Sequence, residues 1–190
     1  MEWTGQTLWT VGHSTLPVEG LVEILRSAGV TQIADVRRFP GSRRHPQFGR
    51  EALQAGLAQS EIGYLWFPEL GGRRTGRGDS PHTALRNASF RAYADHMETD
   101  EFREALERLR QLAAERRTAV MCAEAPWFRC HRMLLSDAVT ALGGRVLHLP
   151  GRGAPREHRL TPGARVVGGR VLYDGGQPSL TLSHTDEPAE

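Results

Sequence analysis

The chain has 190 residues, of which 39% are apolar and 24% are charged, and this size and composition are typical of one compact domain. No apolar run approaches the roughly 18 residues that a membrane-spanning helix requires, and the N-terminus lacks the residue order of a signal peptide. The formal net charge of +2 does not by itself indicate a nucleic-acid-binding protein, and two cysteines are too few for a disulfide-stapled secreted scaffold. We therefore expect a cytoplasmic protein that does not bind membranes.

The first half of the chain alternates short apolar runs with segments of helical periodicity. Apolar side chains recur at helical spacing from Val18 to Leu25, and Gly29 is a suitable residue to end that helix. The segment from residue 70 to residue 88 has four glycines and no apolar period, which predicts a long exposed loop. We predict strands at residues 8–11, 31–36 and 64–67, and helices at residues 17–28 and 50–60.

The second half continues the same alternation. Ser89 and Thr99 are the expected N-caps of two successive helices, of which the second is long and amphipathic. A further helix is predicted at residues 129–142, and strands are predicted at residues 118–122 and 145–149.

Strands that alternate with helices predict a three-layer α/β fold, in which a mostly parallel sheet carries helices on both faces. We assign residues 1–150 to this single domain. Beyond Pro150, glycine and arginine become more frequent, so we expect residues 151–182 to form a C-terminal extension with a short β-hairpin at residues 165–173. Residues 183–190 are expected to be a disordered tail.

Polar residues that are unusual for a buried sheet stand at or just after the ends of four predicted strands. In open α/β sheets, ligands bind beyond the carboxyl ends of the strands, so these residues are candidates for one common site. The alternative is that the acidic and basic residues after the second strand form an ion pair that anchors loops. The residues are His13 and Ser14 at the first strand, Asp35 and Arg37 at the second, Glu69 at the third, and Cys122 and Glu124 at the fourth.

The most reactive residue types lie between positions 122 and 132. Cys130 is the better candidate for a nucleophile, because the predicted helix places it in the first turn beside His131 and Arg132, and each of these features stabilises a thiolate. Glu124 is a candidate acid or base, or a partner for Arg132 or for a substrate amine or hydroxyl. The candidate catalytic residues are therefore Cys130, Glu124, Cys122 and His131. Both cysteines are also compatible with a role as small buried core residues, and this alternative is favoured more for Cys122 than for Cys130.

Cysteine and histidine also bind soft metals, and Cys122, Cys130, His131 and His13 are the residues that would supply such ligands. The seven residues between the two cysteines match no standard zinc spacing, so we expect neither a metal nor another cofactor. A further alternative is a redox or sulfur-handling site, in which the two thiols form a disulfide or one of them carries a persulfide.

Arginines cluster in two loops, and no lysine occurs. Five lie between residues 36 and 50 without an acid, and five lie between residues 70 and 91 beside Asp79 alone. Guanidinium groups bind phosphate oxygens in pairs, which favours an anionic ligand. The alternatives are a solvated surface and ion pairs with the acidic segment at residues 95–115. The candidate substrate-binding residues are His13, Ser14, Asp35, Arg37, Ser42, Arg43 and Arg132.

Aromatic residues lie close to these loops along the chain. Trp127 and Phe128 precede Cys130, and we expect them to contact a ligand. Phe67 and Tyr93 are expected to pack in the core.

Six short motifs follow one another in a characteristic order. They are Gly12-His13-Ser14, Asp35-Val36-Arg37 with Pro40 and Ser42-Arg43, Leu70-Gly71-Gly72, Cys122-Ala123-Glu124, Cys130-His131-Arg132 and His148-Leu149. In this order they resemble domain of unknown function family 488, and the resemblance spans residues 11–149. It implies a bacterial or archaeal α/β domain and assigns no reaction to the motifs.

The leading hypothesis is a small cytoplasmic enzyme that binds a phosphate-bearing ligand, such as a nucleotide or nucleic acid, through the arginine-rich loop and uses Cys130, Glu124 or both in catalysis. One alternative is a non-catalytic nucleotide-binding or nucleic-acid-binding module with structural cysteines. A weaker alternative is the cysteine-based redox or sulfur-handling protein described above. The sequence does not indicate an oligomeric state.

Overall fold

Six strands form one sheet in the computed structural model, which describes residues 1–41 and 45–175. Five of the strands are parallel, and β6 runs antiparallel to its neighbour β5. The predicted mostly parallel sheet is therefore confirmed. The order across the sheet is β3 (Gly63–Trp66), β2 (Gln32–Asp35), β4 (Thr118–Cys122), β1 (Thr7–Gly12), β5 (Arg145–Leu149) and β6 (Arg156–Glu157).

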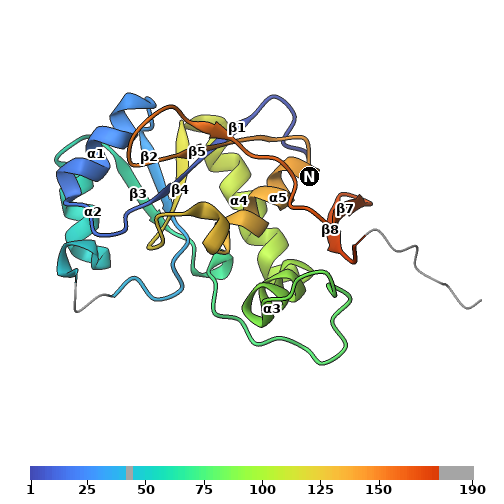
Figure 1. The fold of residues 1–190 in the computed structure, drawn as a ribbon. Helices are drawn as coiled ribbons and strands as arrows, with labels where there is room; N and C mark the ends of the chain where they lie inside the picture. The colour runs from blue at the N-terminus through green and yellow to red at the C-terminus, as the bar shows by residue number, and fades with distance from the viewer. Residues whose placement is uncertain (42–44, 176–190) are drawn as a thin grey trace, which may run out of the picture.

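Helices cover both faces of the sheet, as predicted (Figure 1). One face carries α1 (Val18–Ser27) and α2 (Arg50–Ala58), and the other carries α3 (Ala88–Met97), α4 (Asp100–Glu115) and α5 (Arg132–Ala141). Successive residues of a strand point to opposite faces, so Ile33 of β2 joins the core beneath α1 and α2, whereas Ala34 joins the core beneath α4 and α5. The sheet thus separates two apolar clusters.

The three central strands end together at one edge of the sheet. Gly12 of β1 pairs with Cys122 of β4, and Asp35 of β2 pairs with Met121 of β4. From this edge the chain leaves β1 toward α1 on one face and leaves β4 toward α5 on the other. Connections that diverge in this way open the crevice in which α/β proteins bind their ligands.

The C-terminal extension contains the predicted hairpin, formed by β7 (Ala164–Val167) and β8 (Arg170–Tyr173). Tyr173 is fully buried, and its hydroxyl donates a hydrogen bond to the carboxylate of Asp137 in α5 at 2.8 Å. The extension therefore packs against the domain core. The tail predicted at residues 183–190 lies outside the described residues.

Two predicted helix starts are wrong. Helix α3 begins two residues earlier than a Ser89 cap implies, because the side chain of Asn87 caps it by accepting a hydrogen bond from the backbone N–H of Ser89 at 2.8 Å. Helix α5 begins at Arg132 rather than at residue 129, because residues Trp127–Arg129 form a separate 3-10 turn, η3, and Cys130 is extended. The predicted cap at Thr99 is confirmed.

None of the helices in the described ranges combines the length and the apolar character that are needed to cross a membrane.

Candidate functional site

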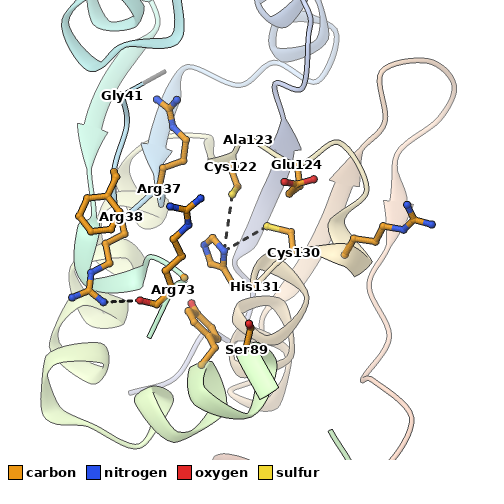
Figure 2. Close-up of a pocket in the computed structure, with 14 residues that line it drawn as sticks. Arg37, Arg38, Gly41, Arg73, Ser89, Cys122, Ala123, Glu124, Cys130 and His131 are labelled. Carbon is orange, nitrogen blue, oxygen red and sulfur yellow. Dashed lines mark hydrogen bonds between the residues drawn. The ribbon is translucent and has the colours of Figure 1, made fainter. Parts of the chain in front are cut away.

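A pocket with a volume of about 320 Å³ opens at the carboxyl edge of the central strands (Figure 2). Its wall contains five of the predicted site residues, namely Arg37, Cys122, Glu124, Cys130 and His131. The pocket therefore joins the loop after β2, the loop after β4 and the start of α5. The remaining lining residues are Arg38, Phe39, Gly41, Gly72, Arg73, Ser89, Tyr93, Ala123 and Arg129.

At the bottom of the pocket, His131 lies between the two cysteines (Figure 2). Its Nδ1 atom is 3.5 Å from Sγ of Cys130 and 4.0 Å from Sγ of Cys122. Its Nε2 atom lies 3.1 Å from the carbonyl oxygen of Val36, which can only accept, so Nε2 carries the proton and donates it. In the neutral ring, Nδ1 then presents a lone pair to the thiols.

In this arrangement the pKa values of the two thiols shift in opposite directions. The pKa of Cys130 lies well below its usual value, because the Cys122 thiol hydrogen-bonds to its thiolate and because His131 and Arg132 add to this stabilisation against the opposing effect of burial. The pKa of Cys122 is raised well above its usual value, first by its interaction with Cys130 and then by burial. These opposite shifts favour Cys130 over Cys122 as the thiolate of the pair.

The guanidinium of Arg132 is buried next to this pair. The side chain is 1% exposed, and its NH2 group donates to the backbone carbonyl oxygens of Glu124 and Ala125. Its Nε atom has no hydrogen-bond partner, and no carboxylate among residues 1–41 and 45–175 forms an ion pair with it. A buried cation requires a compensating anion. The positive charge of Arg132 is among the causes that lower the pKa of Cys130, so a thiolate at Cys130 would supply that anion.

Three further arginines stand around the pocket without a carboxylate partner in the part of the chain that the structure describes. Arg38 donates to the carbonyl oxygen of Arg73 at 2.9 Å, and Arg73 and Arg129 are exposed. Of the five arginines at residues 70–91, only Arg73 lines the pocket. Arg74 and Arg77 instead form ion pairs with the acidic segment, which is the alternative interpretation of that cluster.

Glu124 is the acidic residue in the pocket wall. Its carboxylate is exposed and forms no ion pair with any described residue. The expected contact with Arg132 is made by the backbone carbonyl of Glu124 rather than by its side chain. The carboxylate therefore remains available to a ligand.

His13, Asp35 and Arg37 form a buried network beside the pocket. The guanidinium of Arg37 donates to both carboxylate oxygens of Asp35, at 2.6 to 3.1 Å, and to the carbonyl of Phe48 at 2.8 Å. The ring of His13 stacks on Phe48 with centroids 3.8 Å apart, and burial followed by Arg37 lowers the pKa of His13 to about 4. Tyr64 donates to Asp35 at 2.7 Å. The geometry matches the ion-pair alternative, in which Asp35 and Arg37 anchor loops.

The loop after β1 supports the floor of the pocket instead of lining it. The backbone N–H of Ser14 donates to the carbonyl of Ala123 at 2.9 Å. A Cβ atom on Gly12 would lie 1.9 Å from the carbonyl oxygen of Glu124, so only glycine permits this close approach. The motif Gly12-His13-Ser14 thus positions the backbone at residues 123 and 124.

The family model described as "Domain of unknown function DUF488" matches residues 17–139. The chain belongs to this family. A search of curated proteins and a search of solved structures found no match.

The DUF488 match includes both cysteines and His131, whereas His13, Ser14 and His148 lie outside the matched residues. The predicted ligand residues Ser42 and Arg43 lie within the matched range but fall outside the residues that the structure describes.

Two of the pocket-lining residues that the sequence does not predict as site residues lie close to His131. Tyr93 was assigned to the core, and it is buried, but its ring also lines the pocket 5.1 Å from that of His131. Gly72 approaches the same histidine so closely that a Cβ atom would lie 2.9 Å from Nδ1. The Leu70-Gly71-Gly72 motif was the signal for this contact, because paired glycines often mark a close approach of backbone to a neighbouring group.

Trp127 does not make the ligand contact that was expected for it. Its ring stacks on His148 with centroids 4.0 Å apart and an interplanar angle of 2°, and it does not line the pocket. Phe128 is 52% exposed and packs edge-on against Trp127. The tryptophan therefore attaches η3, which leads directly to Cys130, to the neighbouring strand β5.

Cys122, Cys130 and His131 are also the group of described side chains that could hold a metal, with ligand atoms all within 4.8 Å of one another. A closed zinc site takes four protein ligands, and this group supplies three. Three protein ligands, two of them cysteines, match an open zinc site but not a closed one, so this group is compatible with two free thiols or with an open metal site.

Proposed function

We propose that this protein is a thiol-dependent enzyme that acts on a phosphate-bearing ligand, with Cys130 as the nucleophile and His131 as the group that accepts and returns its proton. The observation that carries the proposal is the placement of His131. Its Nε2–H is fixed on the carbonyl of Val36, so the opposite nitrogen faces Sγ of Cys130 at 3.5 Å. A cysteine next to a correctly oriented histidine is the usual arrangement for an activated thiolate.

The charge of the pocket supports an anionic ligand. Arg38, Arg73 and Arg129 stand at the pocket without carboxylate partners among the described residues, and the buried Arg132 adds a positive charge behind the thiols. Guanidinium groups bind phosphate oxygens through paired N–H donors. The ligand's phosphate would therefore be held beside Cys130.

The proposed step balances with groups already in place. With its proton on Nδ1 of His131, the Cys130 thiolate forms a bond to an electrophilic atom of the ligand. The bond from that atom to the leaving group breaks, and the leaving group takes the electron pair and the proton from His131. Water then attacks the same atom and gives one proton to His131, the bond to sulfur breaks, and Cys130 is left as the thiolate. The mechanism requires reduced cysteines, which is consistent with a cytoplasmic enzyme.

Alkylation with iodoacetamide across a range of pH tests the thiolate. We expect Cys130 to react well below the ordinary thiol pKa of about 8.5, with Cys122 unlabelled, as located by mass spectrometry. Glutathione serves as the reference thiol. In Cys130→Ser, labelling and turnover of phosphate esters should both be lost while phosphate binding persists. Labelling only above pH of about 8.5, or turnover in Cys130→Ser, would overturn the proposal.

A second candidate function is a nucleotide-binding or nucleic-acid-binding module without catalysis, which is favoured by the same unpaired arginines. It predicts that the affinity for nucleic acid falls steeply as the salt concentration rises. Arg73→Gln should make this salt dependence less steep, and Cys130→Ser should leave the affinity unchanged. Fluorescence anisotropy at several salt concentrations, together with a turnover assay, distinguishes the two functions.

A further inference from the structure

The pocket wall carries charges of both signs, from Arg37, Arg38, Arg73 and Arg129 and from Glu124. Figure 2 shows Arg38 and Arg73 on one side of the thiols and Glu124 on the other, with His131 and Cys130 between them. The two arginines have no acidic partner, and Glu124 has no basic partner, within the chain that the structure describes. A ligand that satisfies both sides must itself be dipolar.

Glu124 specifies what the second end of that ligand must carry. An exposed carboxylate repels phosphate and accepts hydrogen bonds, so it favours a group with N–H or O–H donors. Its backbone is fixed, because its carbonyl accepts from the buried Arg132 and its position beside Gly12 leaves no room for movement toward β1. The backbone of Glu124 is therefore fixed at the pocket wall, and its carboxylate extends from that fixed point.

An aromatic surface lies in the same wall. Phe39 lines the pocket and is 65% exposed, and the guanidinium carbon of Arg38 is 5.7 Å from the centre of its ring. An exposed ring within a binding pocket presents a flat apolar face on which a planar group of the ligand stacks. The pocket volume of about 320 Å³ is at the lower end of the range for small-molecule sites.

We propose that the ligand is a nucleotide whose base carries an exocyclic amino group, with its phosphate on Arg38 and Arg73, its base against Phe39 and its amino group donating to Glu124. This assignment names the substrate class of the proposed enzyme and rests on that proposed function only for the chemistry at Cys130. Acidic side chains recognise the amino group of cytosine in the same way in nucleic-acid complexes. A free nucleotide and a nucleotide within a single strand both present these groups.

Matched nucleotide pairs test the assignment by isothermal titration calorimetry on the full chain. AMP and IMP differ at the amino group, as do CMP and UMP, so we expect the amino member of at least one pair to bind about tenfold more tightly. Glu124→Ala should remove this preference, and Arg73→Gln should weaken both members. Glu19→Gln and Arg26→Gln, at exposed positions on α1, are the matched controls. Thermal unfolding of each variant shows that it is folded.

Two further arms make the outcome decisive. A single-stranded oligonucleotide is compared with the mononucleotide, and tighter binding of the oligonucleotide assigns the strand as the source of the nucleotide. Equal affinity within both pairs, or a preference that survives in Glu124→Ala, would overturn the inference. Because binding is also measured in Cys130→Ser, loss of nucleotide preference is distinguishable from failure of the thiolate mechanism, which the alkylation profile reports separately.

Discussion

At the scale of single residues, the acidity of Cys130 depends on a neighbour that does not react. Cys122 lies at the end of β4, where the parallel register fixes its backbone beside Gly12, and its sulfur points into the same pocket. Because its own pKa is raised, it remains a neutral thiol and stabilises the thiolate by hydrogen bonding. Its role is therefore separable from that of the nucleophile.

Replacement of this donor gives the first residue-scale prediction. In Cys122→Ala, the Cys130 thiolate loses the interaction that contributes most to its low pKa, so the midpoint of iodoacetamide alkylation should move upward toward the ordinary value of about 8.5. Ser89→Ala alters another residue of the same pocket wall and should leave the midpoint unchanged. An unchanged midpoint in Cys122→Ala would mean that His131 and Arg132 suffice to stabilise the thiolate.

At the scale of elements, the predicted strands indicate at which edge of the sheet the site lies, but they do not indicate toward which face each side chain points. The carboxyl ends of parallel strands meet at one edge, so the gathering of Asp35, Cys122 and Glu124 followed from strand prediction alone. Side chains alternate between faces, however, and Asp35 shares the face of Ile33 whereas Cys122 lies on the opposite one. This alternation explains why Asp35 and His13 form a separate buried network beside the pocket.

The environment of Cys130 could not be predicted for a different reason. The apolar pattern of the following helix continues back to residue 129, which is why the helix is predicted to begin there. The stacking of Trp127 on His148 joins residues 21 positions apart, and no local sequence pattern reveals it. This contact holds η3 against β5, so that the chain turns through an extended Cys130 before α5 starts. The same tertiary contact removed Trp127 from the set of ligand-binding residues.

His148 itself belongs to a buried chain of hydrogen bonds. Thr10 lies 2.7 Å from its Nδ1, its Nε2 lies 2.9 Å from Nδ1 of His158, and Nε2 of His158 lies 2.8 Å from Asp137. All four groups are satisfied when both histidines are neutral, with each ring donating toward Asp137 and the threonine hydroxyl donating to His148. Burial, then His158 and Arg132, lower the pKa of His148 to about 3.

The neutral state of His148 makes stability depend on pH. In the unfolded chain this histidine binds a proton below its usual pKa of about 6.5, whereas in the folded chain it stays neutral down to about pH 3. The contribution of His148 to the free energy of unfolding is therefore present at neutral pH and is lost as the pH falls from about 6.5 to about 3. Between pH 7 and pH 5 the loss attributable to His148 is about 2 kcal/mol. Urea unfolding at the two pH values measures it, and His148→Gln should show a shallower dependence. An equal slope in both proteins would contradict a neutral buried His148.

At the scale of the whole molecule, the C-terminal extension belongs structurally to the domain that carries the site. The family match ends at residue 139, but Asp137 at its limit receives hydrogen bonds from His158 and Tyr173, both of which follow it in the chain. Composition correctly indicated a hairpin after residue 150. It did not indicate attachment, because single buried polar contacts leave no periodic signal in a sequence.

A conservative change in the hairpin tests this attachment. Tyr173→Phe preserves the buried ring but removes the hydroxyl that donates to Asp137, which leaves one oxygen of a fully buried carboxylate without that partner. We expect a loss of about 1–3 kcal/mol in the free energy of unfolding, measured with urea at neutral pH. Val166→Ala, at a 43% exposed position in the same hairpin, should change stability by no more than about 0.5 kcal/mol. Equal effects of the two substitutions would show that the hairpin is a peripheral attachment. The expected difference would show that the fold around Cys130 extends beyond the part of the chain that matches the family.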